Sequence, residues 1–396
     1  MKIKMYPAEN GDAFLLCSDE VNILVDGGYA KTFSSYVRPD LESMANNEEH
    51  LELVIVTHID SDHIGGIIRF LMLNGGAQVN SIIPLKGIWH NSLRALTSES
   101  EADISPSNLE VLNAIKRRGH PKRQAQDITS VDEISAKQGS TLASLIHAGQ
   151  YIWNEGDGTK SVCVDSVQQK TFSNGFVKVL SPSKLRLANL LKTWKKDLRR
   201  YGFNGSVNSN QVIDDAFEFN FEHRNDTQIN KQSFVSARSQ KRLEDIYTPD
   251  NSIANGSSIA TLIELNGTRV LMLADAWAED VLEELQKMKS QGESMVFDAI
   301  KISHHGSNHN TSPDLLSLVD SPIYFISSNG SKHSHPDIEL LREIVNREAK
   351  FTRTLYFNYS TPESREIKDF QTTSGATFIV EENAIDWIEI TKEYEC

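Results

Sequence analysis

The sequence predicts an α/β protein built from two facing β-sheets with helices on their outer sides. Short runs of β-branched and other apolar residues alternate with amphipathic stretches throughout the 396 residues, which is typical of mixed sheet and helix. Most of the runs form one group before residue 90 and a second group after residue 258. The two groups predict a single catalytic domain, residues 1–396, that is interrupted by helical insertions.

The first half is expected to begin as an antiparallel meander. Turn residues such as Asn10 and Gly11 separate its apolar segments, which favours hairpins over βαβ units. Helices are expected over 32–46 and 64–73, on either side of the apolar strand 53–56. The other expected strands cover 2–6, 13–17 and 21–25, with short ones near Ile82 and Ile88.

Two polar stretches interrupt the strands and predict insertions. Residues 97–169 form a mostly helical insertion, and residues 184–251 form a basic and polar one, with the strand 176–180 between them. Asn266-Gly267 joins the next two apolar runs and is a strong signal for a two-residue hairpin. The expected strands of the second half cover 259–265, 268–273, 297–302, 323–327, 355–358, 377–380 and 386–390.

The composition excludes several classes of protein. Apolar residues make up 39% of the chain and charged residues 24%, unlike a disordered, collagen-like or coiled-coil chain. No stretch approaches the ~20 apolar residues of a membrane helix, and no signal-peptide pattern is present, so we expect a cytoplasmic protein with no membrane partner. The three cysteines show no CxxC spacing. A bound metal would therefore be held by histidines and carboxylates.

The net charge of −14 is unevenly distributed and leaves two basic clusters. One contains Lys116, Arg117, Arg118, Lys122 and Arg123, and the other contains Lys184, Arg186, Lys192, Lys195, Lys196, Arg199 and Arg200, with Trp194 and Tyr201 interleaved. A basic helix is commonly a solvated face, but local positive potential is also what a phosphate backbone requires. The residues expected to contact nucleic acid are Lys192, Lys195, Lys196, Arg199 and Arg200.

The densest chemical signal follows the apolar strand 53–56. His58, Asp60, Asp62 and His63 place four possible metal ligands within six residues, and Gly65-Gly66 allows close backbone approach. Side chains at the carboxyl end of a buried strand face the crevice where α/β proteins usually form their sites. The alternative is a polar helix cap. A cap needs one such residue and has no use for two imidazoles and a second carboxylate.

Three further motifs also follow apolar strands. His304-His305-Gly306-Ser307 follows 299–302, His335-Pro336 comes shortly after 323–327, and Asp275 ends the run 271–273. Seven of the 12 histidines lie in or beside these motifs, namely His58, His63, His304, His305, His309, His333 and His335. Asp275 alone could be a helix N-cap, but its place beside the histidine motifs favours a metal ligand.

These motifs resemble the metallo-β-lactamase superfamily, with Asp60 at the place of the second histidine in the usual His-x-His-x-Asp-His signature. The variant is similar to the metallo-β-lactamase-like domain of ComEC-type DNA-uptake proteins and their stand-alone relatives. The matching pieces are 11–13, 24–28, 58–66, 179–182, 255–258, 273–275, 301–307 and 335–336. The resemblance implies a metallo-β-lactamase-like αββα sandwich with helical insertions, and it does not cover those insertions.

The donor set predicts two divalent metal ions. His58 and Asp60 would hold one ion, Asp62, His63 and His335 would hold the second, and Asp275 would bridge them. The family's further histidine, after a strand corresponding to 176–180, is missing from Ser181-Pro182-Ser183, and an insertion residue such as His223 is a possible replacement. The exchange of His for Asp60 makes Mn²⁺ a competitor to Zn²⁺.

The resemblance also implies roles for residues outside the metal ligands. His304 and His305 would contact the scissile phosphate and assist the leaving group, acting together with Asp62 as the catalytic residues. Asp26 would orient the loop 58–63 as a second-shell residue, although a simple turn carboxylate is an equal alternative.

Three functions remain open from the sequence. The first is a metal-dependent hydrolase of phosphodiesters, a nuclease acting on DNA or RNA, within a bacterial antiviral defence system as the stand-alone relatives suggest. The second is hydrolysis of a small ester, lactone or cyclic nucleotide. The third is a regulatory binding subunit with a structural metal site, in which the insertions contact a protein partner.

Overall fold

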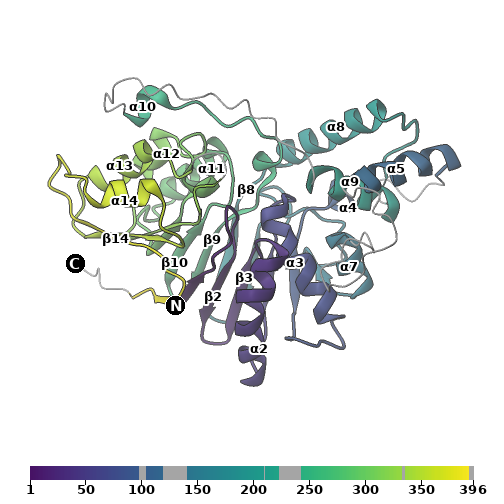
Figure 1. The fold of residues 1–396 in the computed structure, drawn as a ribbon, viewed down its shortest axis with the longest axis horizontal. Helices are drawn as coiled ribbons and strands as arrows, with labels where there is room; N and C mark the ends of the chain where they lie inside the picture. The colour runs from purple at the N-terminus through teal and green to yellow at the C-terminus, as the bar shows by residue number, and fades with distance from the viewer. Residues whose placement is uncertain (98–103, 119–140, 209, 223–241, 332–334, 392–396) are drawn as a thin grey trace, which may run out of the picture.

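Two β-sheets face each other and carry helices on their outer sides, as the sequence predicts (Figure 1). The computed structural model describes residues 1–97, 104–118, 141–208, 210–222, 242–331 and 335–391. The fold is an α/β sandwich of the metallo-β-lactamase-like type, which confirms the predicted fold class. In the described residues, no helix is long and apolar enough to cross a lipid bilayer.

The first sheet has seven strands in the order β15-β1-β2-β3-β4-β5-β6. They are β1 (Lys2–Met5), β2 (Phe14–Ser18), β3 (Val21–Val25), β4 (Leu53–Ile55), β5 (Gly87–Trp89), β6 (Ile152–Trp153) and β15 (Trp387–Glu389). Strands β1, β2 and β3 form the predicted antiparallel meander, whereas β4, β5 and β6 continue the sheet in parallel with β3. The carboxyl ends of β3, β4 and β5 therefore lie along one edge.

The second sheet has eight strands in the order β14-β13-β12-β11-β10-β9-β8-β7. They are β7 (Gln169–Phe172), β8 (Gly175–Ser181), β9 (Ala260–Leu265), β10 (Thr268–Met272), β11 (Ala299–Lys301), β12 (Ile323–Ile326), β13 (Arg353–Phe357) and β14 (Phe378–Glu381). The β9–β10 hairpin turns at Asn266-Gly267, both with positive φ, which an Asn-Gly pair adopts readily. Strands β10 to β14 are parallel, so their carboxyl ends also share an edge.

The helices cover the two outer faces and form a side lobe (Figure 1). On the first sheet lie α1 (Ala30–Thr32), the π-helix η1 (Phe33–Val37), α2 (Arg38–Asn46) and α3 (Ser61–Asn74). On the second lie α11 (Ala278–Ser290), α12 (Pro313–Leu318), α13 (Ile338–Asn346) and α14 (Pro362–Lys368). The other helical segments are α4 (Leu93–Leu96), α5 (Pro106–Arg118), α7 (Leu142–Ala148), α8 (Lys184–Arg200), α9 (Gln211–Glu222), α10 (Leu243–Ile246), η2 (Asn255–Ser257) and η3 (Ser303–Gly306).

The two insertions pack against each other as one lobe. Trp194 of α8 is fully buried against Phe217 and Phe221 of α9, in a core shared with α5 and α7. Asp215 of α9 accepts hydrogen bonds from Lys116 and Thr141, at 2.9 and 2.7 Å. Trp194, which stands among the basic residues in the sequence, is therefore not part of an exposed basic surface, because its ring fills the core of the lobe.

Smaller differences from the predicted elements have local causes. Helix α3 begins at Ser61 and not at residue 64, because the amides of His63 and Ile64 already bond to the carbonyl of Asp60. No strand forms at Ile82, because the Asn74 side chain accepts hydrogen bonds from the amides of Ile82 and Ile83 at 3.0 Å each. Strand β6 lies within the predicted helical insertion, and β7 begins at its last residue, Gln169.

Candidate metal centre

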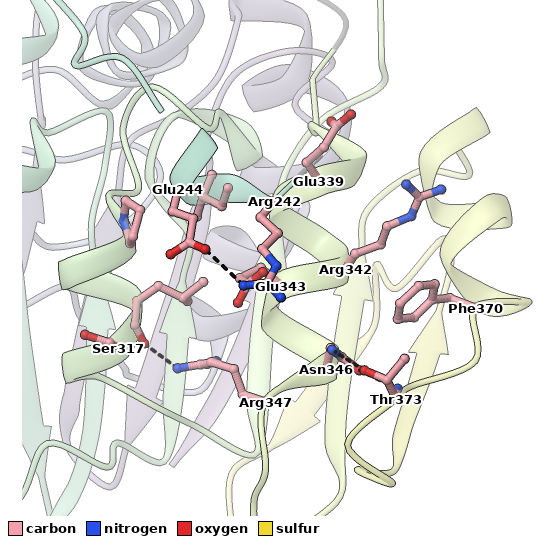
Figure 2. Close-up of a pocket in the computed structure, with 13 residues that line it drawn as sticks. Arg242, Glu244, Ser317, Glu339, Arg342, Glu343, Asn346, Arg347, Phe370 and Thr373 are labelled. Atoms are coloured by element: carbon pink, nitrogen blue, oxygen red, sulfur yellow. Dashed lines mark hydrogen bonds and ion pairs between the residues drawn. The ribbon is translucent and has the colours of Figure 1, made fainter. Parts of the chain in front are cut away.

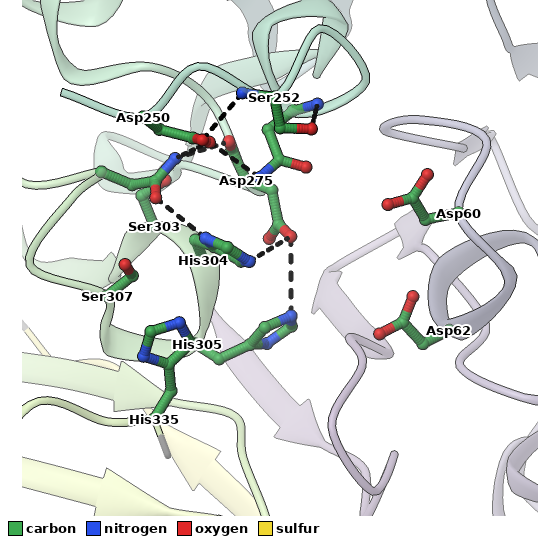
Figure 3. Close-up of polar contacts among 12 residues, drawn as sticks. Asp60, Asp62, Asp250, Ser252, Asp275, Ser303, His304, His305, Ser307 and His335 are labelled. Atoms are coloured by element: carbon green, nitrogen blue, oxygen red, sulfur yellow. Dashed lines mark hydrogen bonds and ion pairs between the residues drawn. The ribbon is translucent and has the colours of Figure 1, made fainter. Parts of the chain in front are cut away.

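The carboxyl ends of three strands bring predicted site residues together at one rim. His58 follows β4, Asp275 follows β10, and His304-His305 follows β11. Figure 3 shows Asp60 and Asp62, from the purple N-terminal half, facing Asp275, His304 and His305 across the gap between the sheets. The site is thus assembled from residues far apart in the sequence, because both sheets end their parallel strands at this rim.

Four imidazole rings surround one carboxylate oxygen. The distances from Asp275 Oδ2 to the Nε2 atoms are 3.8 Å for His58, 3.7 Å for His63, 3.7 Å for His304 and 3.6 Å for His305. These separations are too long for hydrogen bonds. Several ligand atoms that face a common centre at this spacing could share a cation.

Each ring is held in one orientation by a partner at Nδ1. His63 Nδ1 donates to Asp26 Oδ2 at 2.8 Å, and Asp26 also accepts from the amide and hydroxyl of Thr57 at 2.8 and 2.6 Å. Because that hydroxyl donates to Asp26, its oxygen accepts from His58 Nδ1 at 3.1 Å. A proton at Nδ1 leaves the lone pair at Nε2, the arrangement that second-shell acceptors impose on metal-binding histidines.

The second histidine pair is oriented in the same way. His305 Nδ1 donates to the carbonyl of Ser327 at 2.9 Å, and His304 Nδ1 donates to Asn310 Oδ1 at 2.8 Å. The direction at Asn310 follows from its amide nitrogen, which donates to Asp250 Oδ2 at 2.9 Å and to the carbonyl of Asp275 at 3.1 Å. Asn310 and Asp250 are residues that the sequence reasoning missed.

The residues present fit a bound metal. Ligand atoms within 4.8 Å of one another form four groups, namely His58–His63–Asp275, Asp62–His63–His305, Asp12–Asp275–His305 and Asp12–Asp26–His63. Within the described part of the chain, the buried atoms His58 Nε2, His63 Nε2 and Asp275 Oδ1 have no hydrogen-bond partner. Buried polar atoms are rarely left without one. Imidazole and carboxylate donors together suit Zn²⁺ or Mn²⁺.

The charges of the site compensate for one another across the rim. Burial by itself would raise the pKa of Asp275, but the charges of His305, His304, His63 and His58 bring this pKa well below its ordinary value. Burial would lower the pKa of His63, whereas Asp26 and Asp275 raise it well above its ordinary value. Binding of cations at these imidazoles would therefore release protons.

Asp12 and Lys301 form a buried ion pair that the sequence reasoning did not single out. Lys301 Nζ also donates to the carbonyl of Ala274 at 2.9 Å, and Asp12 Oδ1 lies 3.5 Å from His305 Nδ1. The available signal was a lysine inside the apolar run 299–302. The carboxylate partner of that lysine could not be deduced, because Asp12 stands in an ordinary turn.

The backbone at the rim adopts an uncommon conformation. Asp26, Ala274, His304 and His305 have φ values of 55°, 49°, 46° and 58°. Residues other than glycine rarely adopt this left-handed region and do so mainly where the surrounding structure imposes it. A Cβ atom at Gly66 would lie 1.9 Å from the carbonyl oxygen of Gly27, so the loop after β3 locks against α3.

The structure places the remaining predicted ligands at the margin of this cluster. Asp60 Oδ2 lies 3.7 Å from His58 Nε2, and the His335 ring packs on His304 with centroids 5.1 Å apart. Among the described residues, neither Asp60 nor His335 joins a candidate metal group. His305, expected to contact substrate, lies in two of the groups, whereas His304 lies in none and its side chain is 13% exposed.

The segment at the end of β8 where the resemblance predicts a further histidine begins at Ser181 and contains none in Ser181-Pro182-Ser183. Ser181 has a structural contact instead. Its hydroxyl donates to the carbonyl of Ser258 at 2.7 Å and thereby links β8 to the start of β9. His223, the proposed replacement, and His333 lie outside the described residues. His309 contacts the backbone carbonyl of Thr248 at 2.7 Å and so fixes a neighbouring loop.

The basic residues of α8 lie on its outer side. Lys192, Lys196, Arg199 and Arg200 are exposed and Lys195 is half-buried. In the other basic cluster Lys116 pairs with Asp215, whereas Lys122 and Arg123 lie outside the described residues.

A separate cavity of about 460 Å³ lies between α10 and α13, and several arginines line it (Figure 2). Arg342 pairs with Glu366 at 2.5 Å, Arg242 pairs with Glu244 at 3.1 Å, and Arg347 donates to the carbonyl of Val319 at 2.7 Å. Because its cations are already engaged, this cavity is a poor candidate for an anion site.

Comparison with known proteins agrees with this geometry. No curated protein matches the chain. Residues 6–74 match the family model described as "Metallo-beta-lactamase superfamily". That segment contains Asp12, Asp26 and the loop 58–63, which supply the members of the candidate metal groups that come from the first sheet's side of the rim. The match, the sandwich fold and the candidate metal groups support a metal-dependent hydrolase in general.

Proposed function

We propose that this chain is a metal-dependent phosphodiesterase that cleaves DNA or RNA. The observation that carries the proposal is the position of His304. Its partly exposed ring lies beside the buried ligand groups, with Nδ1 held by Asn310 and Nε2 directed toward Asp275. In its doubly protonated form, an imidazole fixed in this way can pass the Nε2 proton to a leaving oxygen and keep the Nδ1 proton on Asn310.

The candidate ligands divide between the two halves of the rim. His58, Asp62 and His63 come from the first half, and Asp275 and His305 come from the second, with Asp60 and His335 at the margin. Divalent ions in such a site supply Lewis-acid polarisation of a substrate oxygen and activation of water. We propose two ions, Zn²⁺ or Mn²⁺.

The protein's own residues fix the remaining parts of the reaction. Asn10 donates a short hydrogen bond to Asp62 and is itself held by Tyr29 at 3.0 Å. Asp62 is therefore fixed at the first turn of α3, where its carboxylate can accept a proton from an attacking water. His304 would serve the opposite end of the scissile bond as the proton donor.

A polymeric substrate is favoured by the exposed α8 residues Lys192, Lys196 and Arg199, which form no ion pair with the described residues. A small ester or lactone gives a positively charged helix no role, whereas a polynucleotide presents phosphates beyond the one that reacts. The protein as a whole carries a net charge of −14. Positive potential concentrated on one element is therefore the feature that a polyanion would recognise.

Hydrolysis of labelled nucleic acids tests the proposal. Purified protein would be incubated with single- and double-stranded DNA and RNA in Mn²⁺, in Zn²⁺ and with chelator, beside a chromogenic phosphodiester, a carboxylic ester and a lactone. We expect metal-dependent cleavage of a nucleic acid, no cleavage with chelator, and loss of activity in His63→Ala. Turnover of only the ester or lactone would replace the proposal with the small-substrate function.

A further inference from the structure

The outer side of α8 forms a groove with the loop before β9. Two hollows, of about 290 and 670 Å³, lie along the helix and share Lys192 and Lys196. We call their combined lining the α8 groove. The residues that matter below are Arg186, Lys192, Lys195, Lys196, Arg199 and Trp277.

The charges of the α8 groove are all of one sign. None of the described residues that line it is Asp or Glu. Arg186 pairs with Asp280 at 2.7 Å and Arg200 pairs with Asp197 at 3.8 Å, whereas Lys192, Lys196 and Arg199 form no ion pair in the described part of the chain. Like charges on one helix face repel one another. An anionic occupant would relieve that repulsion.

The position of the groove connects it to the metal centre. Trp277, at one end, is two residues beyond Asp275, and η2 packs against α8 beside it. From there the 17-residue helix extends outward into the lobe (Figure 1). A helix of this length spans about 25 Å, which corresponds to roughly seven nucleotides at ~3.4 Å per phosphate of one strand.

The aromatic rings near the groove are not available for base stacking. The Arg186 guanidinium lies 4.2 Å from the Trp277 ring centre, and Gly256 lies so close that an added Cβ would be 2.9 Å from that ring. Trp194 is fully buried. Proteins that hold unpaired bases do so on exposed aromatic rings. The described lining can therefore recognise phosphates but not bases.

We infer that the α8 groove binds the sugar–phosphate backbone of a polynucleotide by charge alone, without reading its bases, and leads it to the metal centre. The inference rests on the proposed function for the identity of the substrate. It adds that binding tolerates any sequence, depends strongly on salt and increases with length up to about seven nucleotides on α8.

Binding is tested without cleavage. Affinity for fluorescent oligonucleotides of 2 to about 20 residues would be measured with chelator present, at salt concentrations from 50 to 200 mM. The test variant is Lys192→Gln, Lys196→Gln and Arg199→Gln. The control variant is Lys160→Gln, Lys289→Gln and Lys350→Gln, which removes three exposed cations on other elements. Thermal unfolding confirms that both variants are folded.

The expected results follow from counterion release. Removing three phosphate contacts should reduce the log–log salt slope by about two to three units, so over this fourfold salt range the parent should lose roughly 16- to 64-fold more affinity than the test variant. The control variant should behave like the parent. Oligo-dT and oligo-dA should bind equally, and inorganic polyphosphate should compete with both.

Other outcomes separate the two proposals. An unchanged salt slope in the test variant, or a strong preference for one base, would overturn the inferred role of the α8 groove, even if the protein cleaves nucleic acid. Salt-dependent binding at α8 without any phosphodiester cleavage would support the inferred role of the groove and overturn the proposed function. A requirement for unpaired bases would show that stacking residues elsewhere hold the strand.

Discussion

The rim and the outer face of α8 hold their charges in opposite ways. The four imidazoles around Asp275 at the rim are buried or nearly so, and each has a defined partner at Nδ1, as His63 has in Asp26. On α8 the cations project outward, and Lys192, Lys196 and Arg199 have no ion-pair partner among the described residues. Side chains held in one orientation suit catalysis, whereas exposed cations without an ion-pair partner suit a polymer whose contacts change as it moves.

Loss of the rim carboxylate should have the largest effect. Asp275 faces four imidazoles and belongs to two candidate metal groups. Asp275→Ala would leave the cations without a compensating charge, so we expect at least one ion to be lost completely and activity to vanish. His63→Ala should also reduce metal content sharply. Elemental analysis of the purified variants measures this, with the exposed His147→Ala as control. Full metal content in both rim variants would exclude the assignment.

The two adjacent histidines should differ from each other. The sequence interpretation treats both as substrate contacts, but only His305 lies in a candidate metal group. We expect His304→Ala to keep its metal and lose turnover by about 10²- to 10⁴-fold. His305→Ala should lose metal and turnover together. If instead His304→Ala loses metal while His305→Ala retains it, the two roles are exchanged.

A smaller effect is expected from the residue that fixes His304. Asn310 is fully buried and bonds to His304, Asp250 and the backbone of Asp275. Asn310→Leu should retain metal but lower turnover by about 10- to 100-fold, the usual cost of a second-shell substitution. The tautomer of His304 would be measured by ¹⁵N NMR in the same variant. Unchanged turnover with a changed tautomer would show that ring orientation does not limit the rate.

The smallest effect on binding is expected from the inner side of α8. Trp194 is buried and its indole Nε1 has no hydrogen-bond partner among the described residues. Trp194→Phe should reduce the free energy of unfolding by about 0.5–3 kcal/mol and leave the salt slope of polynucleotide binding unchanged. Denaturant unfolding and the binding titration check this. A loss of affinity in a variant of normal stability would show that Trp194 contributes to polynucleotide binding.

The sequence predicted those site residues that stand directly after a strand. His58, Asp275 and His304 stand directly after apolar runs, and parallel strands place such residues at a common rim. The apolar stripe of α8, with Leu187, Leu190, Trp194 and Leu198 at helical spacing, was equally available. This spacing predicts that Trp194 is buried. The interleaved cations lie on the opposite face of the helix.

The rest of the site could not be read from the sequence, because it depends on pairs that only the fold creates. Asp12 meets Lys301 from the other sheet, and Asp250 reaches His304 only through Asn310. Asp12, Asp250 and Asn310, each taken alone, are ordinary turn or loop residues. Burial and partner decide their role, and both are properties of the assembled sandwich.

Strand β15 has a consequence for how the chain folds during synthesis. It pairs with β1, so Glu389 lies opposite Lys2 and closes the outer edge of the first sheet. Translation at ~5–20 residues per second leaves that edge of β1 open for roughly 20 to 80 s. An unpaired edge can bind other strands. The open edge of β1 is therefore a point at which the growing chain is exposed to wrong pairing until β15 leaves the ribosome.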